Sequence, residues 1–409
     1  MIKLQNRFKG TPSASQNRRL RVAWLHDTAR QIGGCESYIC RTQRHLEDHD
    51  VESVLLYGEN GGGPLDMLPS FRKAFPIVDL ARQLAVIRPD VIYAHRIDGS
   101  ETLQTLADSG LPTLRFFHDH RLFCPREHKY TVWGARTCSK TIGSNCYRCM
   151  GVITRSANWP GVRLRTVHSL RTEQQAHHSL TGFVVASEYM RQHLIDHGFE
   201  SSKIHNIPLY VNSTASKQLP VRLEDELLFV GQVVRGKGLD TLINAMAFVD
   251  KRTKLTVVGT GVQQLASQEL ASQLGLADRI RFVGQKDRKE LNELFRSATA
   301  LVVPSRSPET FGLVGIEAMS HGLPVIASDV GGIREWLMPE STGLLFEPND
   351  TGSLANAISR LTSDSELRSR LSNQSRKDFL NRFTPIHHID PLLNLLRQTA
   401  SAGGCNGTD

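Results

Sequence analysis

The sequence predicts an α/β protein with two parallel sheets, and three observations support this. Short β-branched runs alternate with amphipathic stretches along the chain, which is typical of parallel sheets covered by helices. The 409 residues suit two domains of roughly 200 residues each better than a single core. Residues 213–225 are polar, contain a proline and have no periodicity, so we expect a linker there, between the two sheets.

The division into domains follows from where the apolar runs lie. We expect a disordered basic arm at 1–19, a first domain at 20–212, a second domain at 226–385, and a C-terminal helix and tail at 386–409. Parallel sheets place ligands beyond the carboxyl ends of their strands, so two sheets in tandem should face each other across a central cleft. The expected strands are 21–26, 51–57, 90–95, 111–118 and 181–187 in the first sheet and 226–231, 254–259, 279–284, 300–304 and 323–328 in the second.

The net positive charge comes entirely from the first half of the chain. Residues 1–212 carry 27 Lys and Arg against 19 Asp and Glu, whereas the remainder carries 22 against 22. Residues 121–171, which we call the basic segment, contain ten of these cations and one acid, Glu127. The positive electrostatic field of such a segment attracts phosphates of lipid headgroups, nucleic acids or acidic substrates. A merely solvated basic face is the other interpretation.

Composition limits the class of protein further. With 40% hydrophobic and 22% charged residues, the chain is typical of a globular protein, and no run of 18 uncharged apolar residues offers a membrane span. The basic arm lacks the apolar core of a secretory signal. Seven cysteines, an odd number, favour reduced thiols or a metal over a disulfide framework. We therefore expect a soluble cytoplasmic protein.

The strongest functional signal lies in residues 302–348. A strand ends at Pro304, a polar loop carries Glu309, and a helix begins near Gly312 and carries Glu317. The first turn of such a helix directs free backbone N–H groups and the positive dipole end at the loop, which favours phosphate binding. Carboxylates accept hydrogen bonds from paired hydroxyls, so a sugar and a ribose are suitable partners. Alternatively, the two residues are a helix-end charge and a solvated glutamate.

A second element, residues 231–240, also follows an expected strand and opens a helix. Lys237 and Arg235 could neutralise a diphosphate there, and the glycines at 231, 236 and 238 permit a tight turn. The segment is not a P-loop, because no Gly-Lys-Ser/Thr ends a four-residue spacer.

Taken together and in this order, the motifs resemble family 4 of the retaining glycosyltransferases, which have the GT-B fold of two Rossmann-like domains. The resemblance extends over residues 20–385 and is most specific over 226–348. The matching residues are Gly33 and Gly34 with Glu36, His118 with Asp119, Gly231 with Lys237 and Gly238, and Glu309 with Glu317.

The resemblance implies a second domain that holds a UDP- or GDP-sugar and a first domain that holds the acceptor. It implies that Lys237 binds the donor diphosphate, Glu317 the ribose, and Glu309 the hydroxyls of the transferred sugar. His118 would bond the sugar near its reacting carbon, so that His118, Lys237 and Glu309 take part in the reaction. The turn at Gly33 and Gly34 and the backbone at Thr310, Phe311, Gly312 and Leu313 would cap the sugar and phosphates.

The diphosphate is expected to need no metal cofactor, since cations of the protein can cover it. Many family members have an arginine where this chain has Gln232, so we expect Arg235 to supply the second positive charge.

Four cysteines lie close together in the basic segment and end in a CxxC pair. A structural zinc ion, free or occasionally oxidised thiols, and an iron–sulfur cluster all remain open for them. The four are Cys124, Cys138, Cys146 and Cys149.

These observations favour a transferase acting on a glycan or lipid-linked acceptor in cell-surface polysaccharide or glycolipid biosynthesis. The basic segment would then contact anionic lipid on the inner face of the membrane. The alternative is a small soluble acceptor such as a sugar phosphate. A zinc-stabilised nucleic-acid-binding protein is a remote alternative, because it leaves the glutamate and lysine motifs unexplained and the segment is poor in aromatic residues. We therefore expect no nucleic-acid partner.

Overall fold

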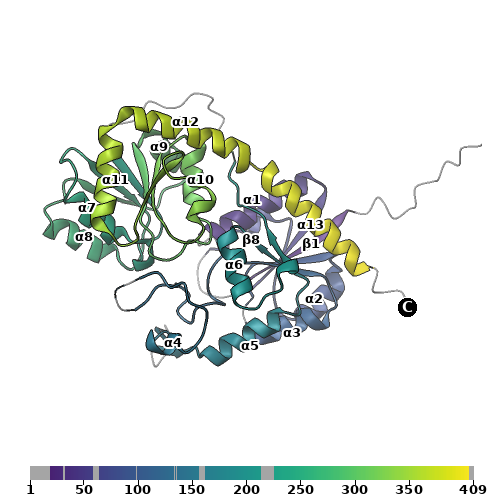
Figure 1. Ribbon diagram of the computed structural model, residues 1–409. Coiled ribbons are helices and arrows are strands. Elements are labelled where there is room, and N and C mark those ends of the chain that lie inside the picture. Colours follow the sequence, from purple (N-terminus) through teal and green to yellow (C-terminus); the bar gives the residue numbers. More distant parts are fainter. Residues whose placement is uncertain are drawn as a thin grey trace, which may run out of the picture.

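The computed structural model describes residues 19–30, 33–58, 64–97, 99–132, 134, 136–155, 162–212 and 225–404. It consists of two α/β domains, and a long C-terminal helix returns from the second to the first (Figure 1). The expected arm and linker lie outside the described residues, except for Arg19 and Asp225. None of the described helices is long and apolar enough to cross a membrane.

The first domain is built on a seven-stranded parallel sheet with the order β3-β2-β1-β4-β5-β8-β9. All five strands expected from the sequence are present. The edge strands β3 and β9 were missed, because runs of three or four residues carry little periodic signal. The strands are β1 (Leu20–His26), β2 (Val51–Tyr57), β3 (Lys73–Pro76), β4 (Val91–Ala94), β5 (Thr113–Phe116), β8 (Gly182–Val185) and β9 (Ile204–Asn206).

Helices and the basic segment complete this domain. The basic segment contains little regular structure: the one-turn helix α4 (Asn145–Arg148), the antiparallel hairpin of β6 (Ile153–Arg155) and β7 (Val162–Leu164), and the start of α5. The other helices are α1 (Gly34–Asp48), α2 (Leu80–Ile87), α3 (Ser100–Asp108), α5 (Val167–His177) and α6 (Glu188–Asp196).

The second domain contains a six-stranded parallel sheet with the order β12-β11-β10-β13-β14-β15. Its five expected strands are confirmed, and β15 is an additional edge strand. They are β10 (Glu226–Val230), β11 (Lys254–Val258), β12 (Ile280–Gly284), β13 (Ala300–Val303), β14 (Val325–Ser328) and β15 (Gly343–Phe346). The helices are α7 (Leu239–Met246), α8 (Gln264–Gln273), α9 (Arg288–Ser297), α10 (Leu313–Ser320), α11 (Thr351–Ser363) and α12 (Ser365–Arg382).

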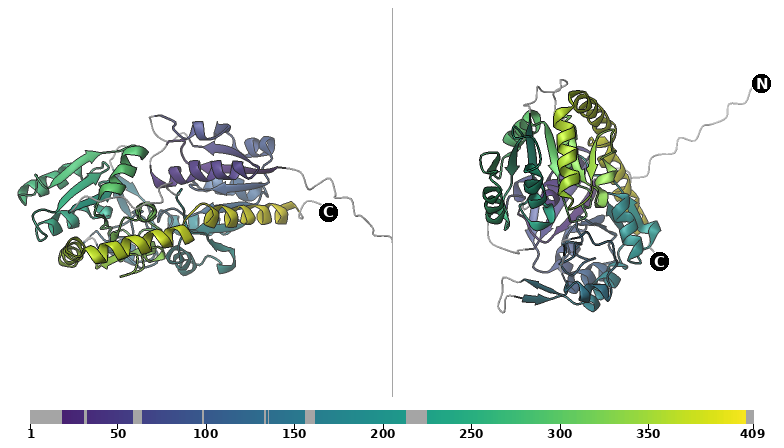
Figure 2. Two further views of the ribbon diagram at one scale, coloured as in Figure 1. Left: turned by 90° about the horizontal axis from the view of Figure 1, so that it is seen from above. Right: turned by 60° about the vertical axis from the view of Figure 1, so that its left-hand side comes forward.

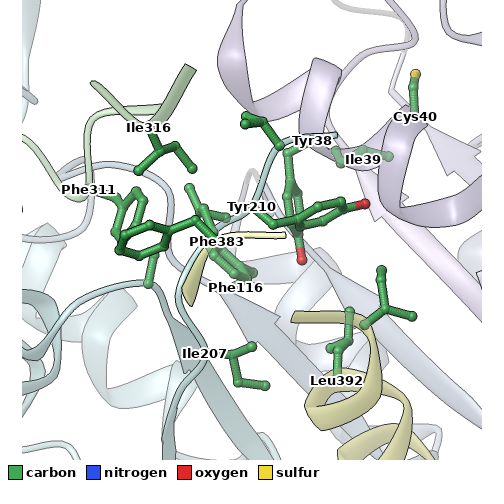
Figure 3. Packing of buried hydrophobic residues seen from close by; sticks show 14 of the residues in the cluster. Tyr38, Ile39, Cys40, Phe116, Ile207, Tyr210, Phe311, Ile316, Phe383 and Leu392 are labelled. Atoms are coloured by element: carbon green, nitrogen blue, oxygen red, sulfur yellow. The ribbon is translucent and has the colours of Figure 1, made fainter. Parts of the chain in front are cut away.

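One continuous hydrophobic cluster joins the two domains. Tyr38 and Phe116 of the first domain belong to the same buried cluster as Phe311 and Ile316 of the second (Figure 3). Phe383, which follows α12, packs against Phe311 with ring centroids 6.0 Å apart. The loop before α10 is therefore anchored in a core that both domains share.

The C-terminal helix α13 (Ile386–Gly404) packs along the first domain (Figure 2). His388 on this helix is fully buried, and its Nδ1 lies 2.7 Å from the carbonyl oxygen of Pro208. Since a carbonyl can only accept, Nδ1 carries the proton and Nε2 accepts from the Tyr38 hydroxyl at 2.9 Å. Tyr93 then donates to Tyr38 at 3.0 Å. This chain of bonds requires a neutral imidazole.

Acidification is expected to weaken the fold through His388. Burial, opposed by the bond to Pro208, lowers the pKa of His388 to about 4. The unfolded chain binds this proton near its ordinary pKa of about 6.5, so the free energy of unfolding falls as pH drops from about 6.5 to about 4. At pH 5 the loss from this one residue is about 2 kcal/mol.

Urea unfolding at pH 7 and pH 5 measures this effect. The His388→Gln variant should lose less stability between the two pH values than the parent protein does. His387→Gln is the matched control, because His387 is the exposed neighbour on the same helix. An unchanged pH dependence in His388→Gln would contradict the assignment of a neutral buried imidazole.

Candidate active site

The loop between β13 and α10 ends at a fixed helix N-terminus. Gly312 caps α10 with a φ of 94°, which is in the left-handed region that favours glycine. The Trp336 Nε1 donates to the carbonyl of Phe311 at 2.6 Å, and the Trp336 ring lies so close to Gly315 that a β-carbon there would be 2.2 Å from it. The predicted helix start near Gly312 is confirmed. Its free N–H groups face the loop that carries Glu309.

Lys237 and Glu309 come into contact at the carboxyl edge of the second sheet. The lysine lies in a one-turn 3-10 helix (Arg235–Lys237) after β10, and its Nζ is 2.7 Å from Glu309 Oε1. Ser305 donates to the same oxygen at 2.5 Å. Burial alone would raise the pKa of Glu309, but the Lys237 charge and these hydrogen bonds outweigh it and lower the pKa. The carboxylate is therefore charged at neutral pH.

Arg306, which the sequence analysis missed, holds the lysine turn in place. Its guanidinium donates to Asp240 and Thr241, both at 2.7 Å, and its side chain is only 9% exposed. The backbone N–H groups of Arg306 and Ser307 both donate to the carbonyl of Gly236. Because 66 residues separate Arg306 from Asp240, no local pattern could identify the pair.

The turn itself requires glycine beside the lysine. Gly238 has a φ of 68°, and a β-carbon at this position would lie 1.9 Å from the carbonyl oxygen of Pro304. The end of β13 and the lysine turn are therefore packed backbone against backbone. This close approach brings Lys237 within reach of Glu309.

Glu317 lies on α10 and is paired with a residue of α9. Arg288 Nη1 is 2.7 Å from Glu317 Oε1, and the glutamate side chain is 17% exposed. Arg41 of α1 lies near this pair, and burial is the main reason why the pKa of Arg41 is lowered. Neither arginine was predicted from the sequence. Gln232 and Arg235, which were, are exposed in the segment after β10, Arg235 within the 3-10 helix.

The glycine turn of the first domain lies against the start of α10. Glu36 accepts a hydrogen bond from the Gly33 N–H at 2.8 Å and contacts His26 Nε2 at 3.2 Å. A β-carbon on Gly34 would lie 3.3 Å from Leu313 Cδ1. The structure therefore brings the two glycine-bearing helix starts, which are far apart in sequence, next to each other.

His118 follows β5 and is fixed in its neutral form. Its Nε2 lies 2.8 Å from His95 Nδ1, and its ring stacks on Phe116. Burial, with further contributions from His26 and Arg96, keeps the pKa of His118 well below its usual value. The backbone carbonyl of His118 accepts from Thr310 Oγ1 at 2.9 Å, so this residue contacts the loop before α10 directly.

Further contacts bring the carboxyl edges of the two sheets together. His120 Nε2 donates to the carbonyl of Pro308 at 3.1 Å, and Ser187 Oγ donates to the carbonyl of Thr310 at 2.6 Å. In both bonds the donor belongs to the first domain and the acceptor to the loop before α10. The geometry agrees with two parallel sheets whose ligand-binding edges face each other.

A polar cavity of about 780 Å³ adjoins His118 on the first domain. Asp119 lies between two cations there, 3.6 Å from Arg96 Nε and 3.5 Å from Arg121 Nε. Arg121 also contacts Glu127, at 3.3 Å. Closely spaced carboxylates and guanidinium groups are suited to the hydroxyls of a sugar.

One cluster of possible metal ligands lies beside the glycine turn of the first domain. Among the described residues, one set of three His, Cys, Asp or Glu side chains has its ligand atoms within 4.8 Å of one another: His26, Cys35 and Glu36. The Asp-x-Asp sequence at Asp48 and Asp50 lies at the end of α1 opposite the glycine turn, with Asp50 paired to Arg19.

Comparison with known families agrees with this architecture. A family model described as "Glycosyltransferase Family 4" matches residues 32–214, and one described as "Glycosyl transferases group 1" matches residues 214–378. An uncharacterised glycosyltransferase of Methanocaldococcus jannaschii is 34% identical over 163 residues, which is 39% of this chain and 42% of that protein. A D-inositol 3-phosphate glycosyltransferase of Frankia alni is 39% identical over 160 residues, 36% and 39% of the two chains. The match thus spans about two fifths of the length of these relatives.

Solved structures show the same fold over nearly the whole chain. HepE of Anabaena in complex with UDP and glucose has a TM-score of 0.71 at 17% identity, covering 93% of this chain and 100% of that one. The lipopolysaccharide outer core galactosyltransferase WaaB has a TM-score of 0.68 at 15% identity, covering 93% and 99%. The two parallel-sheet domains and the two consecutive family matches lead to one conclusion: the chain belongs to the glycosyl transferases of group 1, family 4, and has the GT-B fold.

Proposed function

We propose that this protein is a retaining glycosyltransferase that uses a nucleotide sugar, UDP- or GDP-linked, as its donor. The observation that carries the proposal is the contact between Lys237 and Glu309 beside the N-terminus of α10. A cation and free N–H groups suit a diphosphate, and a charged carboxylate next to them suits the hydroxyls of the attached sugar.

In the proposed reaction, the protein mainly stabilises the charge of the leaving group. The bond between the sugar and the diphosphate breaks through an oxocarbenium-like state, and negative charge grows on the diphosphate. Lys237 and the first turn of α10 neutralise that charge, with Arg235 as the second cation and no metal ion. Glu309 holds the sugar hydroxyls, and neutral His118 bonds the sugar near its reacting carbon. The leaving phosphate takes the acceptor proton, and attack occurs on the same face.

The remaining donor contacts follow from the positions of the two helix starts. Glu317 would bind the ribose hydroxyls. Its carboxylate would either release Arg288 or accept hydrogen bonds from Arg288 and the ribose together. The turn at Gly33 and Gly34 lies against Leu313, so it is placed to cap the sugar from the first domain.

For the acceptor, we propose a glycan or a lipid-linked sugar used in cell-surface polysaccharide or glycolipid synthesis. The cavity beside His118 supports a polyhydroxylated acceptor, and the basic segment supports contact with anionic headgroups on the membrane surface. The names of the relatives, a D-inositol 3-phosphate glycosyltransferase and a lipopolysaccharide galactosyltransferase, fit either this acceptor or a small sugar phosphate.

A ligand panel tests the donor assignment. UDP-, GDP- and ADP-sugars are each added to the protein, and the thermal unfolding midpoint is measured. A donor present at about 100 times its Kd stabilises the folded state by about 2.7 kcal/mol, so one nucleotide series should raise the midpoint by several degrees.

Two variants serve as controls for the panel. Glu317→Gln should reduce the shift for the active series, whereas Glu269→Gln, an exposed glutamate on α8, should leave it unchanged. If no nucleotide sugar shifts the midpoint of the parent protein, the donor assignment is wrong.

A further inference from the structure

Most of the basic segment lies outside the main hydrophobic cores. Leu122 and Phe123 at its start belong to the core of the first domain, but the rest has only a small cluster of its own, Ile142, Val167 and Leu170, with Cys146 and Val152 packed against them. In the described part of the segment, regular structure is limited to α4, a short hairpin and the first turns of α5. Segments with so little apolar burial usually need a crosslink or a metal ion to hold a defined conformation.

The four cysteines of this segment converge on one cavity. Cys124, Cys138, Cys146 and Cys149 all line a space of about 600 Å³, and all four are free thiols. No three of their sulfur atoms lie within 4.8 Å of one another, whereas a tetrahedral zinc ion with bonds of about 2.3 Å needs its sulfur ligands closer than that. Binding an ion would therefore require the thiol side chains to rotate toward one another in the shared cavity.

The positive charges around the cavity favour an anionic occupant. Its described lining includes Arg126, Arg136, Lys140 and Arg148 and no carboxylate. Lys129 adds a fifth cation, with a side chain that is almost completely buried and donates to the carbonyl of Lys140 at 2.5 Å. Arg126 Nη1 is buried and has no hydrogen-bond partner among the described residues. Arg136, Lys140 and Arg148 are exposed, whereas Lys129 and Arg126 Nη1 are buried, and buried cations are costly unless a negative charge lies near them.

We propose that Cys124, Cys138, Cys146 and Cys149 bind one zinc ion as a structural tetrathiolate centre. The four thiols release four protons to solvent on binding, and Zn²⁺ with four thiolates carries a net charge of −2. The cationic lining neutralises this charge. Zinc thereby supplies both the crosslink that the small core lacks and the negative charge that the cavity lacks.

The position of the centre connects it to the loop between β13 and α10 and to the lysine turn. Thr137, next to Cys138, donates through Oγ1 to the carbonyl of Arg306 at 2.9 Å. Tyr130 lies against Gly236, where a β-carbon would be 3.2 Å from Tyr130 Cε1. The ion would therefore hold the segment against the turn that carries Lys237. This role is structural and does not depend on the proposed reaction.

Metal content tests the proposal directly. The full chain, purified without chelator and under reducing conditions, should contain about one zinc per molecule by elemental analysis. After removal of the metal, Co²⁺ should bind and give the intense visible bands of a tetrahedral thiolate site. The double variant Cys146→Ser/Cys149→Ser should lose both signals. Cys40→Ala should keep both, because Cys40 is buried in the main core, away from the cavity.

Limited trypsin digestion gives a second readout that needs no substrate. Chelator-treated protein should be cleaved faster within residues 124–151, at the lysines and arginines that line the cavity, and zinc should restore protection. Protein that contains no metal, binds no Co²⁺ and resists trypsin equally with and without chelator would overturn the proposal. Iron with acid-labile sulfide in place of zinc would overturn the zinc assignment.

Discussion

Replacing Lys237 by methionine is expected to lower kcat/KM by about a hundredfold, which corresponds to about 3 kcal/mol of transition-state stabilisation. The lysine lies beside the N-terminus of α10, where its charge would oppose the negative charge that grows on the leaving diphosphate. Because this charge is larger in the transition state than in the bound donor, both binding and the chemical step should suffer. Methionine keeps most of the aliphatic stem, so the packing of the turn is preserved.

Single-donor kinetics on the two purified proteins measure this loss, with circular dichroism to confirm folding. Lys251→Met is the matched control, since Lys251 is exposed and lies in the turn before β11. Removing the lysine also leaves Glu309 without its cation. A Lys237→Met/Glu309→Gln double variant separates the loss of the lysine charge from the effect of an unpaired carboxylate. Near-parental activity of Lys237→Met would place the donor site elsewhere.

The second large effect is expected from Glu309→Gln, which should reduce transfer on the order of a hundredfold while sparing the binding of free nucleoside diphosphate. In the ligand-free structure this carboxylate is the partner of Lys237, at 2.7 Å. Glutamine removes the charge that competes with the diphosphate for the lysine, so the affinity for the nucleoside diphosphate should stay the same or increase. The sugar hydroxyls lose a charged acceptor, so transfer should fall.

Calorimetry with the nucleoside diphosphate and with the intact nucleotide sugar distinguishes these outcomes. Glu269→Gln, a change of the same type on an exposed face of α8, should affect neither ligand. Equal losses of affinity for both ligands would move Glu309 out of the sugar pocket and leave it as a support for the lysine turn.

Several features of this protein could be predicted from the sequence because they depend on local order. Buried strands appear as β-branched runs, and the ten strands expected from them are all present. The start of α10 near Gly312 was also predicted, and Gly312 adopts the positive φ that favours glycine. Lys237 and Glu309 were singled out by their positions in segments that follow an expected strand and open a helix, and the resemblance to a family implied their individual roles.

Other features were decided only by the tertiary structure, because they depend on which distant segments the parallel crossovers bring together. Lys237 and Glu309 are 72 residues apart, yet they form an ion pair because β10 and β13 are neighbours in the sheet. Arg306 is a support for the lysine turn for the same reason. The return of α13 to the first domain depends on the bonds of His388 to Tyr38 and Pro208. Side-chain periodicity specifies which face of an element is buried, but the partner of a charged or polar group is fixed only when the elements pack.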